Sequence, residues 1–235
     1  MPGVTRGIMG RVEHLFAPDA ADRGDSLLAL IVSDYIAYYG PSTRMRKRWG
    51  VGGRGIGGGW RVESPRRLAL LFLPRLINNP CLHASVLIRL AARSPRFMLG
   101  FWRTVLIAKH SIDVSHNMEI GPGLLLPHPV GIALGNGVRI GRNATIFHYV
   151  GLGGNVLGTQ GFRSWKPGAQ LCPVVGNDVV IFMEALVVGA ITIGDRAVIG
   201  AGAWVDRDLA SGAIHPGRAA LFRQLAVPED APPRQ

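Results

Sequence analysis

The chain has 235 residues, 48% of them hydrophobic, which is enough to bury one or two cores. Its formal net charge of +11 comes mainly from arginine and favours phosphate-bearing or polyanionic partners, but no recognition motif accompanies it, which argues against nucleic-acid binding. The two cysteines, Cys81 and Cys172, have no paired spacing, so we expect a reducing compartment and predict a cytoplasmic protein. The first residues lack the apolar segment of a secretory signal, and the run LALLFLPRL is too short to span a bilayer.

Residues 1–110 are predicted to form an α-helical N-terminal domain. The segment DSLLALIVSDYIAYYG opens with two capping residues and closes with glycine, as a helix does. Two of three further helices have Ser-Pro starts suited to the N-cap and first helical positions. These three are expected over residues 64–77, 81–93 and 94–110. Residues 41–62 are basic and glycine-rich and predict a loop. Its charge best fits a solvated loop, with an anionic surface or a polyanionic acceptor or carrier as alternatives.

From residue 111 the sequence follows a six-residue period. An aliphatic side chain recurs at every sixth position, with one shift of two residues and one interruption. These positions are Ile120, Leu126, Ile132, Val138, Ile140, Ile146, Leu152, Val175, Ile181, Val187, Ile193, Ile199 and Val205. A helix does not tolerate the accompanying glycine content at this period. Short parallel strands separated by regular turns do, so the pattern predicts a β-helix solenoid.

The period is interrupted over residues 153–174, GGNVLGTQGFRSWKPGAQLCPV. This irregular stretch is predicted to be a loop that projects from the solenoid, and long loops of this kind are often functional. The solenoid domain is therefore expected over residues 111–224, with the loop inside it. Residues 225–235 are predicted to be a disordered tail.

The frame of the repeats, the two-residue shift, the LGG before the loop and the preceding CLHASVLIRLA helix resemble the serine acetyltransferase family. The resemblance covers roughly residues 65–218 and is closest over 112–154. It implies an α+β fold, in which an α-helical domain precedes a left-handed parallel β-helix of hexapeptide repeats. It also implies a catalytic pair, matched here by Asp113 in IDVSH and His128 in LPHPVG.

The chemistry of such a pair is consistent with acyl transfer. An alcohol becomes a useful nucleophile when a base takes its proton, and a histidine that titrates near neutrality suits this task. A carboxylate on the other ring nitrogen fixes the tautomer and stabilises the imidazolium. A solvated turn histidine is the alternative for His128, and it is what we expect by default of His116 and His148. A zinc site like that of the β-helical carbonic anhydrases is not favoured, because no close histidine pair completes one.

Several residues differ from those by which the family reads serine. Pro127 stands where the resemblance implies an aspartate, Leu171 and Cys172 replace an Arg-His pair, and Arg66 replaces an acidic residue. Losing these charges predicts an acceptor other than free serine. His148 and Trp165 are candidate substrate-binding substitutes, and Cys172 is either a further contact or a small apolar filler.

The resemblance also implies a groove for acetyl-CoA, lined by backbone amides and small residues. The matching positions are Gly154, Ala185, Ala203 and Arg218, and the arginine could meet a CoA phosphate. Met183 and Glu184 stand where small residues are expected.

We therefore expect an acetyl-CoA-dependent O-acetyltransferase with no metal. The acceptor is a small molecule with a hydroxyl or amine, and the assembly is a homotrimer or dimer of trimers. The alternatives are acetylation of a sugar or glycan, and a catalytically silent β-helix scaffold. The sequence ends in APPRQ and lacks the terminal isoleucine by which many family members bind cysteine synthase, so no such complex is expected.

Overall fold

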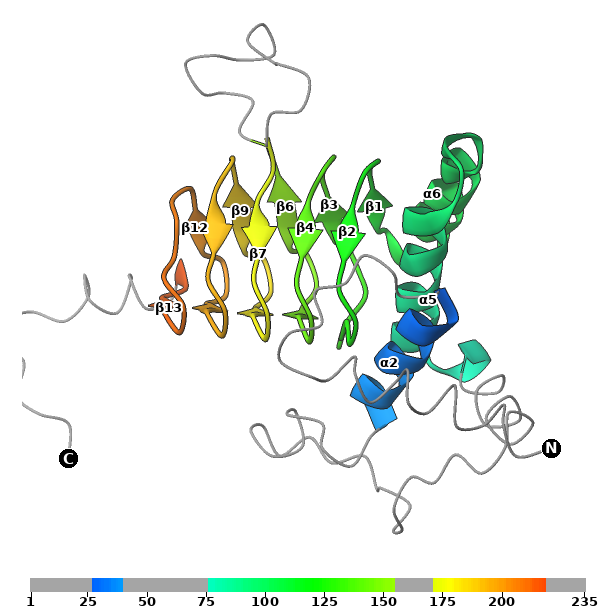
Figure 1. The fold of residues 1–235 in the computed structure, drawn as a ribbon, viewed down its shortest axis with the longest axis horizontal. Helices are drawn as coiled ribbons and strands as arrows, with labels where there is room; N and C mark the ends of the chain where they lie inside the picture. The colour runs from blue at the N-terminus through cyan, green and yellow to red at the C-terminus, as the bar shows by residue number, and fades with distance from the viewer. Residues whose placement is uncertain (1–26, 40–75, 155–170, 219–235) are drawn as a thin grey trace, which may run out of the picture.

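The computed structural model describes residues 27–39, 76–154 and 171–218. Within them the chain forms a solenoid of short parallel strands, with three helices packed at its N-terminal end (Figure 1). The helices are α2 (Leu27–Tyr39), α5 (Pro80–Arg93) and α6 (Arg96–His110). None of these described helices is long and apolar enough to cross a membrane.

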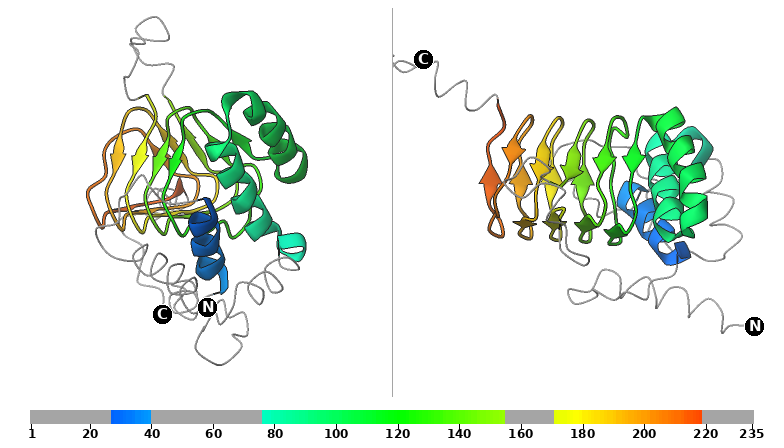
Figure 2. Two further views of the ribbon diagram at one scale, coloured as in Figure 1. Left: turned by 45° about the vertical axis from the view of Figure 1, so that its right-hand side comes forward. Right: turned by 90° about the horizontal axis from the view of Figure 1, so that it is seen from above.

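The strands form three parallel sheets, each of which takes one strand from each successive coil. Sheet A contains β1 (Asp113–Val114), β3 (Ala133–Leu134), β6 (Gly151–Gly153), β9 (Leu186–Val188) and β12 (Trp204–Val205). Sheet B contains β2 (Glu119–Ile120), β4 (Arg139–Ile140), β7 (Val174–Val175) and β10 (Thr192–Ile193). Sheet C contains β5 (Thr145–Ile146), β8 (Val180–Ile181), β11 (Val198–Ile199) and β13 (Ile214–His215). Figure 2 shows the coils stacked side by side, with the helices at one end. The predicted parallel solenoid behind N-terminal helices is confirmed.

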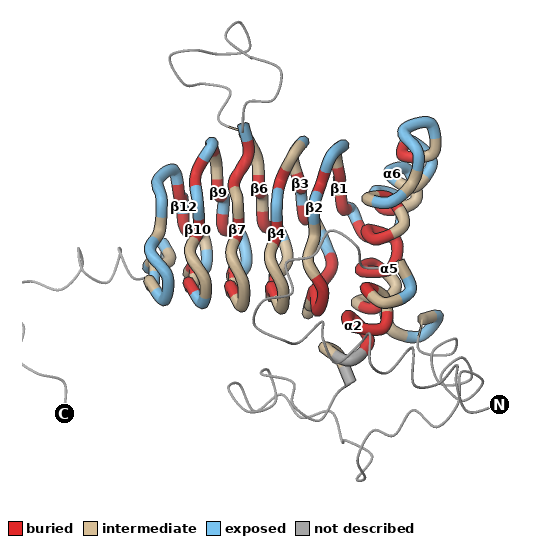
Figure 3. Tube along the Cα trace, in the orientation of Figure 1, coloured by how far each residue is buried: buried red, intermediate tan, exposed pale blue. Residues whose placement is uncertain are grey.

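The six-residue frame corresponds to the interior of the solenoid. Every frame residue is buried except Ile120, which is half-buried. A strand alternates its side chains between two faces, so residues two positions before the frame also point inward. Ala185 and Ala203 are two such residues, exposed by only 0% and 4%. In Figure 3 the buried positions run along the inside of the coils, while much of α6 is exposed.

Each turn between sheets is named by the sheets it joins. The B–C corner comprises residues 121–124, 141–144, 176–179, 194–197 and 210–213, and the C–A corner comprises 127–132, 147–150, 182–185 and 200–203. Both corners use a residue with positive φ whose N–H donates to a carbonyl of the preceding coil. At the B–C corner, for example, Asn143 donates to Pro122 over 2.8 Å and Asp178 to Arg142 over 2.8 Å.

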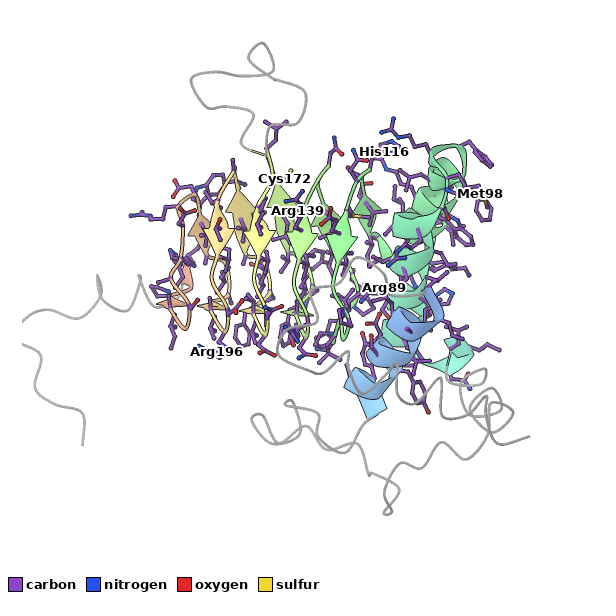
Figure 4. All side chains as sticks on the ribbon, in the orientation of Figure 1. Arg89, Met98, His116, Arg139, Cys172 and Arg196 are labelled. Atoms are coloured by element: carbon purple, nitrogen blue, oxygen red, sulfur yellow. The ribbon has the colours of Figure 1, made fainter. Side chains whose placement is uncertain are left out.

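The first coil has no preceding coil, so the helices take its place. At the B–C corner, Gly123 N–H donates to Ser33 Oγ over 3.0 Å and Leu124 N–H to Asp34 Oδ1 over 2.9 Å, both from α2. Arg89 of α5 forms a buried ion pair with Asp34 and donates to the carbonyls of Ile120 and Gly121 (Figure 4). Burial raises the pKa of the Asp34 carboxyl, and Arg89 opposes that rise.

The helix boundaries differ from the Ser-Pro prediction. Helix α5 begins at Pro80 behind Asn79, whose Oδ1 accepts from the Cys81 and Leu82 N–H groups. Ser94 is the C-cap of α5 and donates its hydroxyl to Leu90 O over 2.6 Å, so its predicted N-cap role for α6 is wrong. Pro95 is the N-cap of α6 and makes no side-chain cap bond. The physical reason is that the chain turns between two consecutive helices here, and the hydroxyl satisfies a carbonyl at the end of the first. Most of the predicted helix 64–77 and all of the loop 41–62 lie outside the described residues.

Candidate active site

His128 lies at the C–A corner of the first coil, between Pro127 and Pro129. The proline rings fix two backbone torsions of this turn, and Val130 N–H donates to His128 O over 2.9 Å. Gly131 N–H donates to His110 O at the end of α6 over 3.3 Å. The His128 side chain is exposed, so the backbone is tightly held while the imidazole stays accessible.

The helices hold this turn from behind. The Tyr38 hydroxyl of α2 accepts from Leu126 N–H over 2.7 Å and lies 3.2 Å from the carbonyl oxygens of Cys81 and Leu126. The Cys81 thiol of α5 donates to Pro127 O over 3.2 Å. The turn that carries His128 is thus supported by all three described helices, because α6 supplies the carbonyl bonded to Gly131.

Aromatic side chains of the next two coils form a row that begins beside His128. Its ring lies edge-on to His148, with ring centroids 5.6 Å apart, and 6.2 Å from Phe147. Phe147 stacks on Phe182 one coil further on, at 5.1 Å. The Nδ1 atom of His148 is buried and has no hydrogen-bond partner among the described residues. The predicted candidate His148 is therefore a direct neighbour of His128.

Asp113 lies at the start of β1, in register with Ala133 of β3. Its carboxylate accepts two hydrogen bonds from Arg103 of α6, at 2.5 and 2.8 Å. These bonds hold the pKa of the Asp113 carboxyl below its ordinary value, although burial acts in the opposite direction. Among the described residues no hydrogen bond joins Asp113 to His128, so the structure does not connect the expected pair directly.

A second histidine pair lies beneath the turn and was not anticipated from the sequence. His83 Nδ1 of α5 and His110 Nε2 of α6 are 2.8 Å apart. Burial lowers the pKa of both imidazoles, helped by the nearby Lys109 and, for His110, by His83. The spacing of 27 residues between two helices gave no sequence signal for this contact.

The candidate donor-binding residues occupy different parts of the coil. The side chains of Ala185 and Ala203 point into the core, so any contact to a donor from these residues would come from the backbone. Arg218 N–H donates to Ala201 O over 2.9 Å, which places this exposed arginine at the C–A corner of the last described coil. Gly154 directly follows β6 of sheet A, on another edge of the solenoid.

The remaining candidates lie away from His128 or outside the described residues. Cys172 stands two residues before β7 and is buried, and burial raises the pKa of its thiol (Figure 4). Its sulphur packs against Gly135 and Gly154, as a small apolar filler would. Leu171 is exposed beside it, and His116 is an exposed turn residue that accepts from Gly137 N–H over 3.1 Å. Trp165 and Arg66 lie outside the described residues, as do residues 155–170, most of the predicted projecting loop.

A shallow groove of about 270 Å³ runs along the outer face of sheet A. Its floor is formed by small residues at Ala133, Gly135, Gly151 and Gly153, and Asp113 lies at one end. Small outward residues leave room for the backbone of the solenoid to be approached closely. The exposed Leu186 and Trp204 continue the same face in later coils.

No family model matches the chain. A serine acetyltransferase of Helicobacter pylori strain 26695 is 34% identical over 146 residues, which cover 60% of this chain and 80% of that protein. The serine acetyltransferase of Mycobacterium tuberculosis is 31% identical over 134 residues and is half covered, at 50% of its length.

Solved structures of serine acetyltransferases are also similar to the chain. The soybean serine acetyltransferase apoenzyme is 26% identical with a TM-score of 0.54, over 82% of this chain and 67% of that one. The native serine acetyltransferase 1 of Entamoeba histolytica, at 22% identity and a TM-score of 0.59, supports the fold over 89% of this chain and 67% of that one.

Proposed function

The chain belongs to the serine acetyltransferase family, and we propose that it transfers the acetyl group of acetyl-CoA to a hydroxyl acceptor other than free serine. The observation that carries the proposal is His128, an exposed imidazole on a rigid turn of an otherwise aliphatic repeat. Family membership also supports a left-handed winding of the coils.

His128 acts as the general base. It takes the proton of the acceptor hydroxyl while that oxygen attacks the thioester carbonyl carbon, and backbone amides of the groove stabilise the resulting oxyanion. When the tetrahedral intermediate collapses, the carbon–sulphur bond breaks and the imidazolium returns its proton to the departing thiolate. The products are an acetyl ester and free CoA, and the base is regenerated.

Asp113 orients His128 in this proposal, as the resemblance to the family implies. To do so it must leave or share Arg103, which holds it in the free protein. Both side chains are about half exposed, 49% for Arg103 and 46% for Asp113, and exposed pairs of this kind contribute little to stability. Exchange of the carboxylate between Arg103 and His128 is therefore inexpensive.

The donor lies along the C–A corner. Four coil-to-coil steps separate the coil of His128 from that of Arg218, which at about 4.8 Å per step is ~19 Å. An extended donor with its thioester at His128 would bring its phosphates toward the guanidinium of Arg218. Gly154 lies on a different edge, so it would contact this donor from a neighbouring copy, as a homotrimer or dimer of trimers would provide.

The absence of the serine-reading charges argues against free serine as the acceptor. Pro127 lies in the turn of His128 and has no charge, and Cys172 is inside the core. A small zwitterion left without ion partners loses several kcal/mol, or orders of magnitude in specificity. We also expect no complex with a cysteine synthase.

A thiol-release assay tests the proposal. Acetyl-CoA is supplied with L-serine, hydroxy acids, amino sugars or methyl glycosides, and kcat/KM is compared across the panel. We expect at least one other hydroxyl acceptor to exceed L-serine by orders of magnitude. L-serine as the best substrate at ordinary enzymatic efficiency would overturn the acceptor assignment, and a chain that neither binds nor turns over acetyl-CoA would be a scaffold.

A further inference from the structure

Tyr149 is the most unusual residue of the C–A corner. It occupies the position with positive φ, which elsewhere at this corner is held by Gly131, Glu184 and Gly202. Its φ is 56°, a region that a bulky L residue rarely adopts. The Tyr149 ring has room over the previous coil because the equivalent residue there is a glycine. A Cβ on Gly131 would overlap the ring. The ring is nonetheless 54% exposed.

Tyr149 is connected to the base through His148. The His148 and Tyr149 ring centroids are 5.3 Å apart in an edge-on arrangement, and those of His128 and His148 are 5.6 Å apart. The Tyr149 ring packs over Gly131, and its exposed part lies next to His148, which separates it from the base. A molecule seated on Tyr149 must extend past His148 to reach His128, which suits an acceptor larger than a three-carbon amino acid.

The polar groups around the ring match a neutral hydroxylated ligand. The exposed carboxylate of Glu184 follows Tyr149 at the same corner position of the next coil. Among residues 127–131, 147–150 and 182–185, Glu184 carries the only fixed charge. These segments offer no cation for the carboxylate of a free amino acid.

We propose that Tyr149, His148 and Glu184 form an acceptor subsite for a pyranose ring, whose hydroxyl is presented to His128. The apolar face of the sugar stacks on Tyr149, as amphipathic aromatic side chains allow. Its hydroxyls donate to the exposed Glu184 carboxylate, and the His148 imidazole lies between the sugar and the base. This inference rests on the proposed function and names the class of its acceptor.

The test compares two substitutions of one residue. Tyr149→Asn removes the ring but keeps a residue type that already holds positive φ in this chain, at Asn117 and Asn143. Tyr149→Phe keeps the ring and is the matched control. Binding of the methyl glycosides of glucose, galactose, mannose and N-acetylglucosamine is measured by saturation-transfer NMR, with L-serine alongside, and kcat/KM is measured by thiol release.

We expect at least one glycoside to bind the wild type more tightly than L-serine does. Tyr149→Asn should weaken that binding about tenfold and lower kcat/KM in parallel, while Tyr149→Phe stays close to wild type. Tighter binding of L-serine, or unchanged glycoside binding in Tyr149→Asn, would overturn the subsite. Glycoside binding that depends on Tyr149 in a protein that releases no thiol would support the subsite and overturn the proposed activity.

Discussion

The two corners of the solenoid share one backbone design but carry different side chains. At both, a residue with positive φ donates its N–H to the coil before it, as Asp178 does to Arg142 and Glu184 to His148. The B–C corner adds polar side chains that cap the preceding coil: Asn177 Oδ1 accepts from Arg142 N–H at 2.9 Å, and Asp195 Oδ1 from Asn177 N–H at 2.7 Å. The C–A corner instead carries imidazole and aromatic rings.

The two corners of each coil therefore have different roles, one in stability and one in the chemistry. Side-chain oxygens that satisfy backbone N–H groups of neighbouring coils hold the stack together, so the B–C corner is structural. The rings of the C–A corner make no comparable caps, and His148 Nδ1 has no bond among the described residues. Substitutions at the B–C corner should therefore affect folding, and substitutions at the C–A corner should affect turnover.

Removal of the base should give the largest effect. We expect His128→Ala to lower kcat for the best acceptor by ~10²–10⁴-fold, the usual loss when a general base is removed. Because the side chain is exposed and makes no hydrogen bond that a coil needs, the midpoint of thermal unfolding should stay unchanged. Thiol release and calorimetry measure the two quantities. Unchanged turnover would remove His128 from the mechanism.

Breaking the helix clamp of the B–C corner should affect folding instead. Asp34→Ala leaves Arg89 buried without its partner and Leu124 N–H without its acceptor, which should reduce the free energy of unfolding by about 3–5 kcal/mol. Urea denaturation measures the loss. Ser33→Ala removes the acceptor of Gly123 N–H and the Ser33 hydroxyl bond to Leu30 O, but leaves no buried charge unpaired, and should cost about 1–3 kcal/mol. Equal losses of stability in the two variants would contradict the larger contribution assigned to the Asp34–Arg89 pair.

Loss of a side-chain cap within the stack of coils should reduce the free energy of unfolding by less. Asn177→Ala removes the acceptor of Arg142 N–H, in a turn that is only partly buried, and should lower the free energy of unfolding by about 1 kcal/mol. The kcat/KM of this variant should equal that of the wild type. A large loss of activity without a loss of stability would show that the B–C corner takes part in the chemistry.

Relief of strain at Tyr149 should have the opposite sign. An L residue at positive φ costs roughly 1–2 kcal/mol, less for asparagine, so Tyr149→Asn should raise the unfolding free energy by up to about 1 kcal/mol. Loss of the ring contact with Gly131 offsets part of this gain. The informative result is higher stability together with weaker acceptor binding, which would mark Tyr149 as retained for function. A stability loss would place it among the structural residues.

The smallest effect concerns pH and the histidine pair beneath the C–A corner. Burial lowers the pKa of His83 and His110 in the folded protein, so the unfolded chain takes up protons first as the pH falls below the ordinary value of 6.5. Stability should be complete above that pH and should decline below it until the folded-state values are passed. Unfolding midpoints between pH 8 and pH 5, compared with those of a His83→Gln variant, measure the decline. An identical pH dependence in the variant would contradict the assignment.

The solenoid could be predicted from the amino-acid sequence alone. A fixed period with aliphatic residues describes a local geometry that repeats, so each frame position predicts an inward side chain without knowledge of the rest of the fold. The same alternation could have placed Ala185 and Ala203 inside, since each precedes a frame residue by two. His128 could likewise be predicted as the base, because it is a titratable residue in a turn whose sequence resembles that of the family.

The side-chain contacts between coils and helices could not be predicted from the sequence. Asp34 and Arg89 are 55 residues apart, His83 and His110 are 27 apart, and no period relates either pair. The hydrogen bond between Arg103 and Asp113 depends on how α6 packs against β1. The position of the Tyr149 ring depends on a glycine in the previous coil. A repeat fixes position along its own axis because its geometry is local. Contacts between its turns and the packed helices arise only when the whole chain is folded.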